Sequence, residues 1–127
     1  MARFFIVVAA LSGGLSVGIG AFAAHGLKNR LSPEMIEIVK TGAQYQMYHA
    51  VALLVIAFLL INKPAVSGLK ASGWAFILGT LMFSGSLYAL AMDGPRWLGP
   101  VTPLGGLCFL IGWSLLAIAG WRIKPLP

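Results

Sequence analysis

Four long runs of residues almost free of charge constrain this chain more than any other feature. They extend over residues 4–24, 50–61, 71–92 and 104–121. Hydrophobic residues make up 59% of the chain and charged residues only 9%, too few to coat a water-soluble domain. A helix needs about 20 apolar residues to cross the hydrocarbon core of a bilayer. The sequence therefore predicts a multi-pass membrane protein.

Turn and cap residues between the runs predict where the helices begin and end. Ser32-Pro33-Glu34 combines an N-cap serine, a proline at the first helical position and a carboxylate near the positive helix end. Thr102-Pro103 repeats the cap and proline before the last run. We expect an all-α, four-transmembrane-helix bundle in a single integral membrane domain (residues 1–127), with helices at about 4–24, 33–61, 71–92 and 103–121.

The second of these helices is longer than a bilayer requires. At a rise of 1.5 Å per residue it would reach about 42 Å, which exceeds the hydrocarbon core. Its first turns, which carry Glu34, Glu37 and Lys40, are therefore expected to extend into the interface. The first run also resembles a signal peptide ending in Ala21-Phe22-Ala23. Because its apolar stretch is longer than a typical signal core, we interpret it as a retained helix.

Positive charges flank the apolar runs. The net charge is +6, but the nine Lys and Arg residues lie singly or in pairs and form no basic stripe, which argues against nucleic-acid binding. The side of the membrane that holds both termini would carry five of them: Arg3, Lys63, Lys70, Arg122 and Lys124. The other side would carry Lys28, Arg30, Lys40 and Arg96. This small excess predicts cytoplasmic termini. The membrane itself is expected to be a bacterial plasma (inner) membrane.

Small residues indicate where helices pack. Gly14 and Gly18 form a GxxxG pattern in the first helix, and Gly105, Gly106 and Gly112 lie in the last. In lipid, small residues allow helix backbones to approach closely. We therefore expect helix packing at these five glycines and a buried first helix.

The topology gathers polar residues on one side of the membrane, because the loops after the first and third helices lie together. Polar groups at membrane depth face the bundle interior or water. The simplest interpretation is hydrogen bonding between helices. A second is a pocket for a lipid headgroup, quinone or small solute. The candidate residues for this pocket are His25, Tyr45, Gln46, His49, Ser84, Tyr88 and Thr102.

Enzyme and cofactor chemistry find little support in the sequence. No Cys-x-x-Cys, Walker loop, dinucleotide fingerprint or zinc-spaced His/Cys cluster occurs, and Cys108 is the single cysteine. A third interpretation of the polar cluster is a haem held by His25 and His49, but two histidines are weak evidence for it. The tryptophans lie mostly near helix ends, as in aromatic belts. We expect a protein that is not an enzyme and has neither a metal site nor a cofactor.

Four motifs together resemble one family. They are Gly20-Ala-Phe-Ala-Ala-His-Gly-Leu27, Tyr45-Gln-Met-Tyr-His-Ala50, Phe83-Ser-Gly-Ser-Leu-Tyr88 and Thr102-Pro-Leu-Gly-Gly106 followed by Gly112-Trp113. The chain is similar in these to the YgdD/YwdK family of small membrane proteins, a domain of unknown function with eukaryotic relatives. The resemblance implies four transmembrane helices and supplies no activity. Its motif residues coincide with the one-sided polar cluster.

Three functions therefore remain open. The first is a non-catalytic accessory or scaffold subunit that packs in a membrane complex or a homo-oligomer, with the lipid bilayer and another membrane protein, or itself, as partners. The second is a small-solute or proton-coupled transporter or channel, in which His49 would have to carry the proton. The third is a lipid- or quinone-binding protein that uses the polar cluster around His49.

Overall fold

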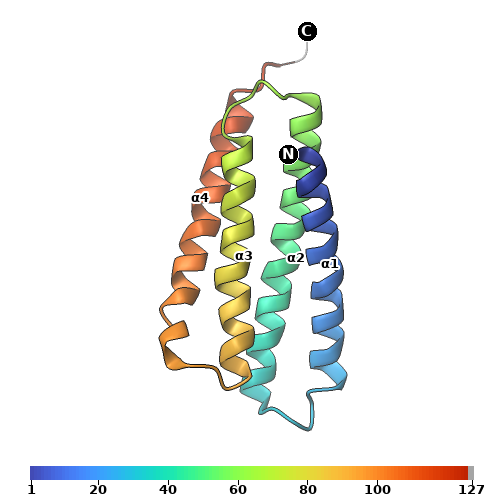
Figure 1. The fold of residues 1–127 in the computed structure, drawn as a ribbon, viewed down its shortest axis with the longest axis vertical. Helices are drawn as coiled ribbons and strands as arrows, with labels where there is room; N and C mark the ends of the chain where they lie inside the picture. Colours follow the sequence, from blue (N-terminus) through green and yellow to red (C-terminus); the bar gives the residue numbers. More distant parts are fainter. Residues whose placement is uncertain (126–127) are drawn as a thin grey trace.

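The computed structural model describes residues 1–125 as four long helices joined by short loops (Figure 1). These are α1 (Ala2–His25), α2 (Pro33–Asn62), α3 (Leu69–Ala91) and α4 (Val101–Trp121), with a 3-10 turn, η1 (Arg96–Leu98), before α4. Four spans are long and apolar enough to cross a membrane, and the part described contains no strand. The all-α, four-transmembrane-helix prediction is confirmed.

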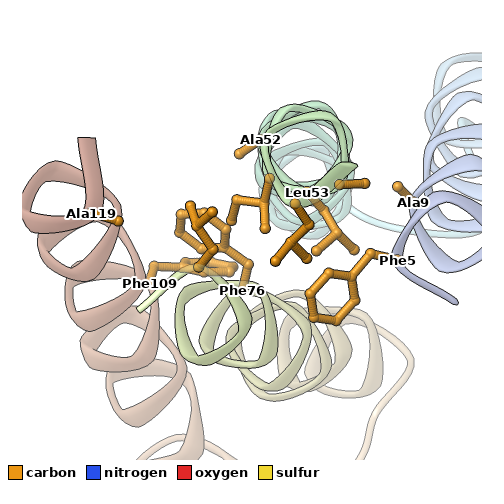
Figure 2. Packing of buried hydrophobic residues seen from close by; sticks show 11 residues of the cluster. Phe5, Ala9, Ala52, Leu53, Phe76, Phe109 and Ala119 are labelled. Atoms are coloured by element: carbon orange, nitrogen blue, oxygen red, sulfur yellow. The ribbon is translucent and has the colours of Figure 1, made fainter. Parts of the chain in front are cut away.

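The helices alternate in direction and are arranged around a central pair. Helices α2 and α3 pack together, α1 packs on α2, and α4 packs on α3. Figure 2 shows α1 and α4 on opposite sides of this pair. The start of α1 and the end of α4 lie at the same end of the bundle, as predicted (Figure 1). The loops after α1 and α3 consequently meet at the other end.

Two apolar clusters fill the contacts between helices. The larger surrounds Phe5, Ile56, Phe76 and Phe109, which are at most 5% exposed (Figure 2). The smaller lies at the opposite end of the bundle and contains Ala23, Leu27, Val39 and Ala91. Because lipid tails are as apolar as these side chains, close packing rather than removal from water stabilises the contacts.

Several large rings lie directly on glycines of a neighbouring helix. The Phe76 ring of α3 lies against Gly112 of α4, where an added Cβ would be 2.5 Å from it. The Tyr88 ring of α3 lies against Gly42 of α2, where the corresponding distance is 2.6 Å. A Cβ at Gly105 would overlap the backbone nitrogen of Phe83. Glycine is therefore required at these positions because another helix occupies the space of a side chain.

One predicted helix start is confirmed and another is wrong. Ser32 caps α2, since its hydroxyl accepts a hydrogen bond from the Met35 backbone N–H at 3.2 Å. Thr102 does not cap α4, which begins at Val101 after Pro100. Pro103 fits inside the first helical turn because the N–H that it lacks has no intrahelical partner there. Thr102 is left free to hydrogen-bond with Ser86 of α3.

The prediction of a buried first helix is wrong within this chain. Only 17% of the most apolar stretch of α1 is buried, compared with 44% for α2. The physical reason is the arrangement of the bundle: α1 packs mainly on α2, whereas α2 packs on both α1 and α3. When a helix is apolar on all sides, its sequence does not show which side faces protein and which side faces lipid.

Candidate functional site

Gln46 connects three helices. Its side chain is 4% exposed and lies in the middle of α2. The amide Nε2 donates to the Ser12 carbonyl of α1 at 2.9 Å, and Oε1 accepts from the Tyr88 hydroxyl of α3 at 2.7 Å. Both ends of the amide are thus paired at a depth where an unpaired polar group would be costly.

Two serines of α3 donate hydrogen bonds to backbone carbonyls exposed by glycines. Ser84 donates to the Gly42 carbonyl of α2 at 2.7 Å, and Ser72 donates to the Gly112 carbonyl of α4 at 2.7 Å. Both serines are at most 1% exposed. Glycine allows the close approach that these bonds require, so α3 is fixed in register against both neighbours.

His49 is held on both sides of its ring. Its Nε2 accepts from the Trp113 indole N–H at 3.1 Å, and its Nδ1 lies 2.7 Å from the Tyr45 carbonyl. An acceptor at Nε2 places the proton of the neutral ring on Nδ1, which donates to that carbonyl. The ring also stacks on Phe109 at 3.5 Å with an interplanar angle of 4°. A proton or metal at Nε2 would have to displace Trp113.

A cavity of about 340 Å³ opens beside this network, between α1, α2 and α3. Its polar lining consists of Ser12, Gln46, His49, Thr80, Ser84 and Tyr88. Its rim includes Leu11, Leu15 and Leu81, which are 59–70% exposed, so it opens sideways on the outer surface of the bundle. We call it the lateral cavity. No Lys, Arg, Asp or Glu side chain lines it.

The structure brings together four of the seven residues that the sequence assigned to a pocket. Gln46, His49, Ser84 and Tyr88 line the lateral cavity. The other three lie elsewhere. Tyr45 is 38% exposed and packs on Phe83, Thr102 pairs with Ser86, and His25 is exposed as the last residue of α1.

Sequence reasoning missed three residues of this region. Ser12 and Thr80 contribute hydroxyls to the lateral cavity, and Trp113 bonds to His49. The spacing of Thr80, Ser84 and Tyr88 at steps of four was the available signal for Thr80. Trp113 lies in the middle of α4, which should have separated it from the tryptophans of the aromatic belts.

The five glycines expected to pack helices divide into two groups. Gly105 and Gly112 lie in the contact between α3 and α4, and Gly106 lies at its edge, 3.9 Å from the Phe83 ring when a Cβ is added. Gly14 and Gly18 lie on the exposed side of α1, where an added Cβ would have no neighbour within 4 Å. The GxxxG pattern of α1 therefore packs against nothing within residues 1–125.

Within residues 1–125, no group of three His, Cys, Asp or Glu side chains is placed to hold a metal ion. Cys108 is half-buried in α4 and is paired with no other cysteine. Glu37 and Lys40 form an exposed ion pair at 3.8 Å, near the start of α2.

Comparisons with known proteins identify relatives of the whole chain. Residues 19–106 match a family model described as a protein of unknown function, DUF423. YwdK of Bacillus subtilis, a UPF0382 membrane protein, is 40% identical over 92% of this chain and 95% of its own length. The UPF0382 inner membrane protein YgdD of Escherichia coli is 38% identical over 96% of this chain and 92% of its own length.

A third relative, a UPF0382 membrane protein of Haemophilus influenzae, is 40% identical over 99% of this chain and all of its own length. No solved structure matches the chain. The relatives are named as membrane proteins and their names state no activity, so chemical function has to be argued from this chain's own residues.

Proposed function

This chain belongs to the DUF423 (UPF0382) family of membrane proteins, and from that premise we propose that it is a non-catalytic accessory or scaffold subunit. It packs in the membrane with a partner protein or with further copies of itself. The observation that carries the proposal is the outward-facing GxxxG pattern of α1: Gly14 and Gly18 are exposed, with open space where a side chain would be.

The exposed stripe is longer than the two glycines. Ala10 and Ala21 extend it by one turn at each end, and both are exposed. We call these four residues the α1 stripe. A stripe of this kind lets a second helix approach until the two backbones are in contact, which is a common basis of helix association in lipid. Its exposure in the single chain supports a docking helix from elsewhere.

The polar network supports a structural rather than a transport role. A proton carrier at membrane depth needs a group that can gain and lose a proton as it faces each side. His49 is 5% exposed, and both of its ring nitrogens have partners within the bundle. Gln46 likewise has partners at both ends of its amide. This network supports a fixed helix register.

Native mass spectrometry of the full-length protein, released gently from its own membrane, tests the proposal. The expected species contains this chain and a partner in fixed stoichiometry, or a defined number of copies. The Gly14→Leu/Gly18→Leu variant is expected to lose that species because leucines block close helix approach. A monodisperse monomer from the native membrane would contradict a scaffold role.

Gly120→Leu is the matched control. Gly120 is exposed on α4, and an added Cβ there also has no neighbour within 4 Å, so the substitution adds one such leucine to the other outer helix. The control should keep the assembled species. If both variants lost it equally, the effect would come from added bulk at any lipid-facing position rather than from the α1 stripe.

Family membership also leads us to propose where the protein is located. A bacterial inner membrane with both termini in the cytoplasm agrees with the name of the relative YgdD and with the excess of Lys and Arg at the terminal end. Labelling in intact cells of a cysteine introduced at Lys63 or at Arg30, each in a Cys108→Ala protein, tests the orientation. An impermeant thiol reagent should modify the cysteine at Arg30 and leave the one at Lys63 unmodified.

A further inference from the structure

The lateral cavity has the size and lining of a binding site for a small apolar ligand. Its volume of about 340 Å³ lies in the range of small-molecule sites, which runs from about 300 to 1,000 Å³. Leu11, Leu15, Leu53 and Leu81 supply hydrocarbon, while a few polar groups converge from three helices. Such a combination is typical of sites that bury a ligand and orient it through a small number of hydrogen bonds.

Two hydroxyls in this cavity have no partner within residues 1–125. Ser12 and Thr80 line the cavity, and neither side chain makes a hydrogen bond to the described part of the chain. Other helical serines here, such as Ser16 and Ser114, donate to a carbonyl one turn earlier in their own helix. In hydrocarbon an unpaired hydroxyl is costly, so a ligand oxygen that accepts a hydrogen bond would be stabilised at this position.

The depth of the hydroxyls selects the class of ligand. Ser12 lies near the middle of α1 (Ala2–His25), and Thr80 lies near the middle of α3 (Leu69–Ala91), so both are close to the midplane. The ester and phosphate oxygens of a phospholipid stay in the interfacial region and do not reach this depth. The accepting oxygen must therefore belong to a lipid that lies wholly within the hydrocarbon.

The lining also excludes charged ligands. No Lys, Arg, Asp or Glu contributes to the cavity, and both nitrogens of His49 are already bonded within the bundle. The rim is made of exposed leucines in membrane-spanning helices, so a ligand enters sideways from the bilayer rather than from water. A charged group would have to give up its hydration on this route.

From these observations we propose that the lateral cavity binds a neutral lipid of the isoprenoid quinone class. A carbonyl oxygen of the ring accepts hydrogen bonds from the Ser12 and Thr80 hydroxyls. The hydrocarbon part of the lipid lies against the leucines of the cavity and leaves through the opening between α1 and α3. The proposal concerns binding alone and includes no redox step.

Binding of tritium-labelled decylubiquinone to the full-length protein in phosphatidylcholine nanodiscs tests this site. Empty nanodiscs give the background from partition into lipid. We expect saturation at one probe per chain, and no competition by decylbenzene, which has a similar ring and tail but lacks carbonyl oxygens. Probe binding that rises without saturation, or that decylbenzene displaces fully, would overturn the proposal.

Two sets of variants place the probe in the lateral cavity. Gly85 lines the cavity and has open space at its Cβ position, so Gly85→Leu fills the cavity without a backbone clash. It should weaken binding at least tenfold, whereas Gly120→Leu, with open space at the far side of the molecule, should stay within twofold. Equal binding by Gly85→Leu and the unmodified protein would overturn the proposal.

The hydroxyls are tested by a variant that adds no bulk. Ser12→Ala/Thr80→Val removes both donors, keeps the shape of the threonine side chain, and should weaken binding about tenfold. This variant tests binding in the lateral cavity even if Gly85→Leu disturbs folding. Far-ultraviolet circular dichroism and elution volume show whether each variant is folded. Binding by the double variant within twofold of the unmodified protein would contradict the assigned hydrogen bonds.

Discussion

Helices α1 and α4 are alike in exposure and differ in how they are attached. In each, only 17% of the most apolar stretch is buried, and each lies on the outside of the central α2–α3 pair (Figure 2). Helix α4 is joined to α3 by close backbone approach, whereas α1 leaves the lateral cavity beside it and presents its GxxxG pattern outward. The two helices are therefore equally exposed but are attached to the central pair in different ways.

Helix α4 contacts α3 so closely that neither backbone can shift. Gly105 brings its backbone against Phe83, and the Gly112 carbonyl accepts from the Ser72 hydroxyl at 2.7 Å. Trp113 adds a hydrogen bond to His49 of α2. These contacts fix α4 in one register, which is what a structural helix requires.

The attachment of α1 is looser in its middle. Its hydrogen bond to the central pair is the one that the Gln46 side chain donates to the Ser12 backbone carbonyl. A Cβ added at Gly13 would lie 3.7 Å from the Ala50 Cβ, which is an ordinary contact distance. The glycines of the two helices therefore differ in what surrounds them. Gly105 and Gly112 of α4 are packed against α3, whereas Gly14 and Gly18 of α1 would have no neighbour within 4 Å of an added Cβ.

The largest expected effect is that of Gly105→Ala. The added methyl group overlaps the Phe83 backbone, which cannot move without shifting α3. We expect a loss of about 3 kcal/mol in the free energy of unfolding, measured by denaturant titration in mixed micelles. A loss smaller than that of Gln46→Leu would show that α4 is not held by close backbone approach.

Gln46→Leu should come next. It removes the hydrogen bonds to α1 and α3 and leaves the Tyr88 hydroxyl without that acceptor. Two interhelical bonds of average strength predict a loss of about 1.2 kcal/mol in the free energy of unfolding. Tyr88→Phe removes one of the two bonds and is the matched control, with an expected loss about half as large.

Trp113→Phe should have a smaller effect. It keeps an aromatic ring over His49 and removes the indole donor, so one interhelical hydrogen bond is lost. The expected loss is about 0.6 kcal/mol in the free energy of unfolding. No change at all would indicate that the His49 ring is held by stacking on Phe109 alone.

The smallest effect is expected for Gly14→Ala, the counterpart of Gly105→Ala on the other outer helix. The added methyl group meets no atom within 4 Å, so the free energy of unfolding of the single chain should change by less than about 0.5 kcal/mol. A loss as large as that of Gly105→Ala in the isolated monomer would remove the distinction between the two helices.

Much of the fold could be predicted from the sequence because membrane spans are set by length and charge. The absence of charge in residues 71–92 predicted α3, which occupies Leu69–Ala91, and Ser32-Pro33 marked the start of α2. These are local signals: a cap needs its own N–H partners and a span needs enough apolar residues. The gathering of Gln46, His49, Ser84 and Tyr88 followed from topology.

The errors arose where a helix is apolar on all sides. Nothing in the sequence of α1 shows that Gly14 and Gly18 face outward, because the lipid-facing and protein-facing residues are chemically alike. The same ambiguity concealed the contact of Trp113 with His49, since an indole suits a membrane interface and a buried acceptor equally well. Thr102 was misread because Pro100 already supplied the helix start.

Site-specific photo-crosslinking in the native membrane tests the difference between α1 and α4 most directly. A photoreactive phenylalanine analogue at Gly14 and another at Gly120 place the same probe on two exposed positions of the outer helices. If α1 carries the docking surface, we expect a discrete protein adduct from Gly14 and lipid adducts alone from Gly120. A protein adduct from Gly120 with none from Gly14 would contradict it.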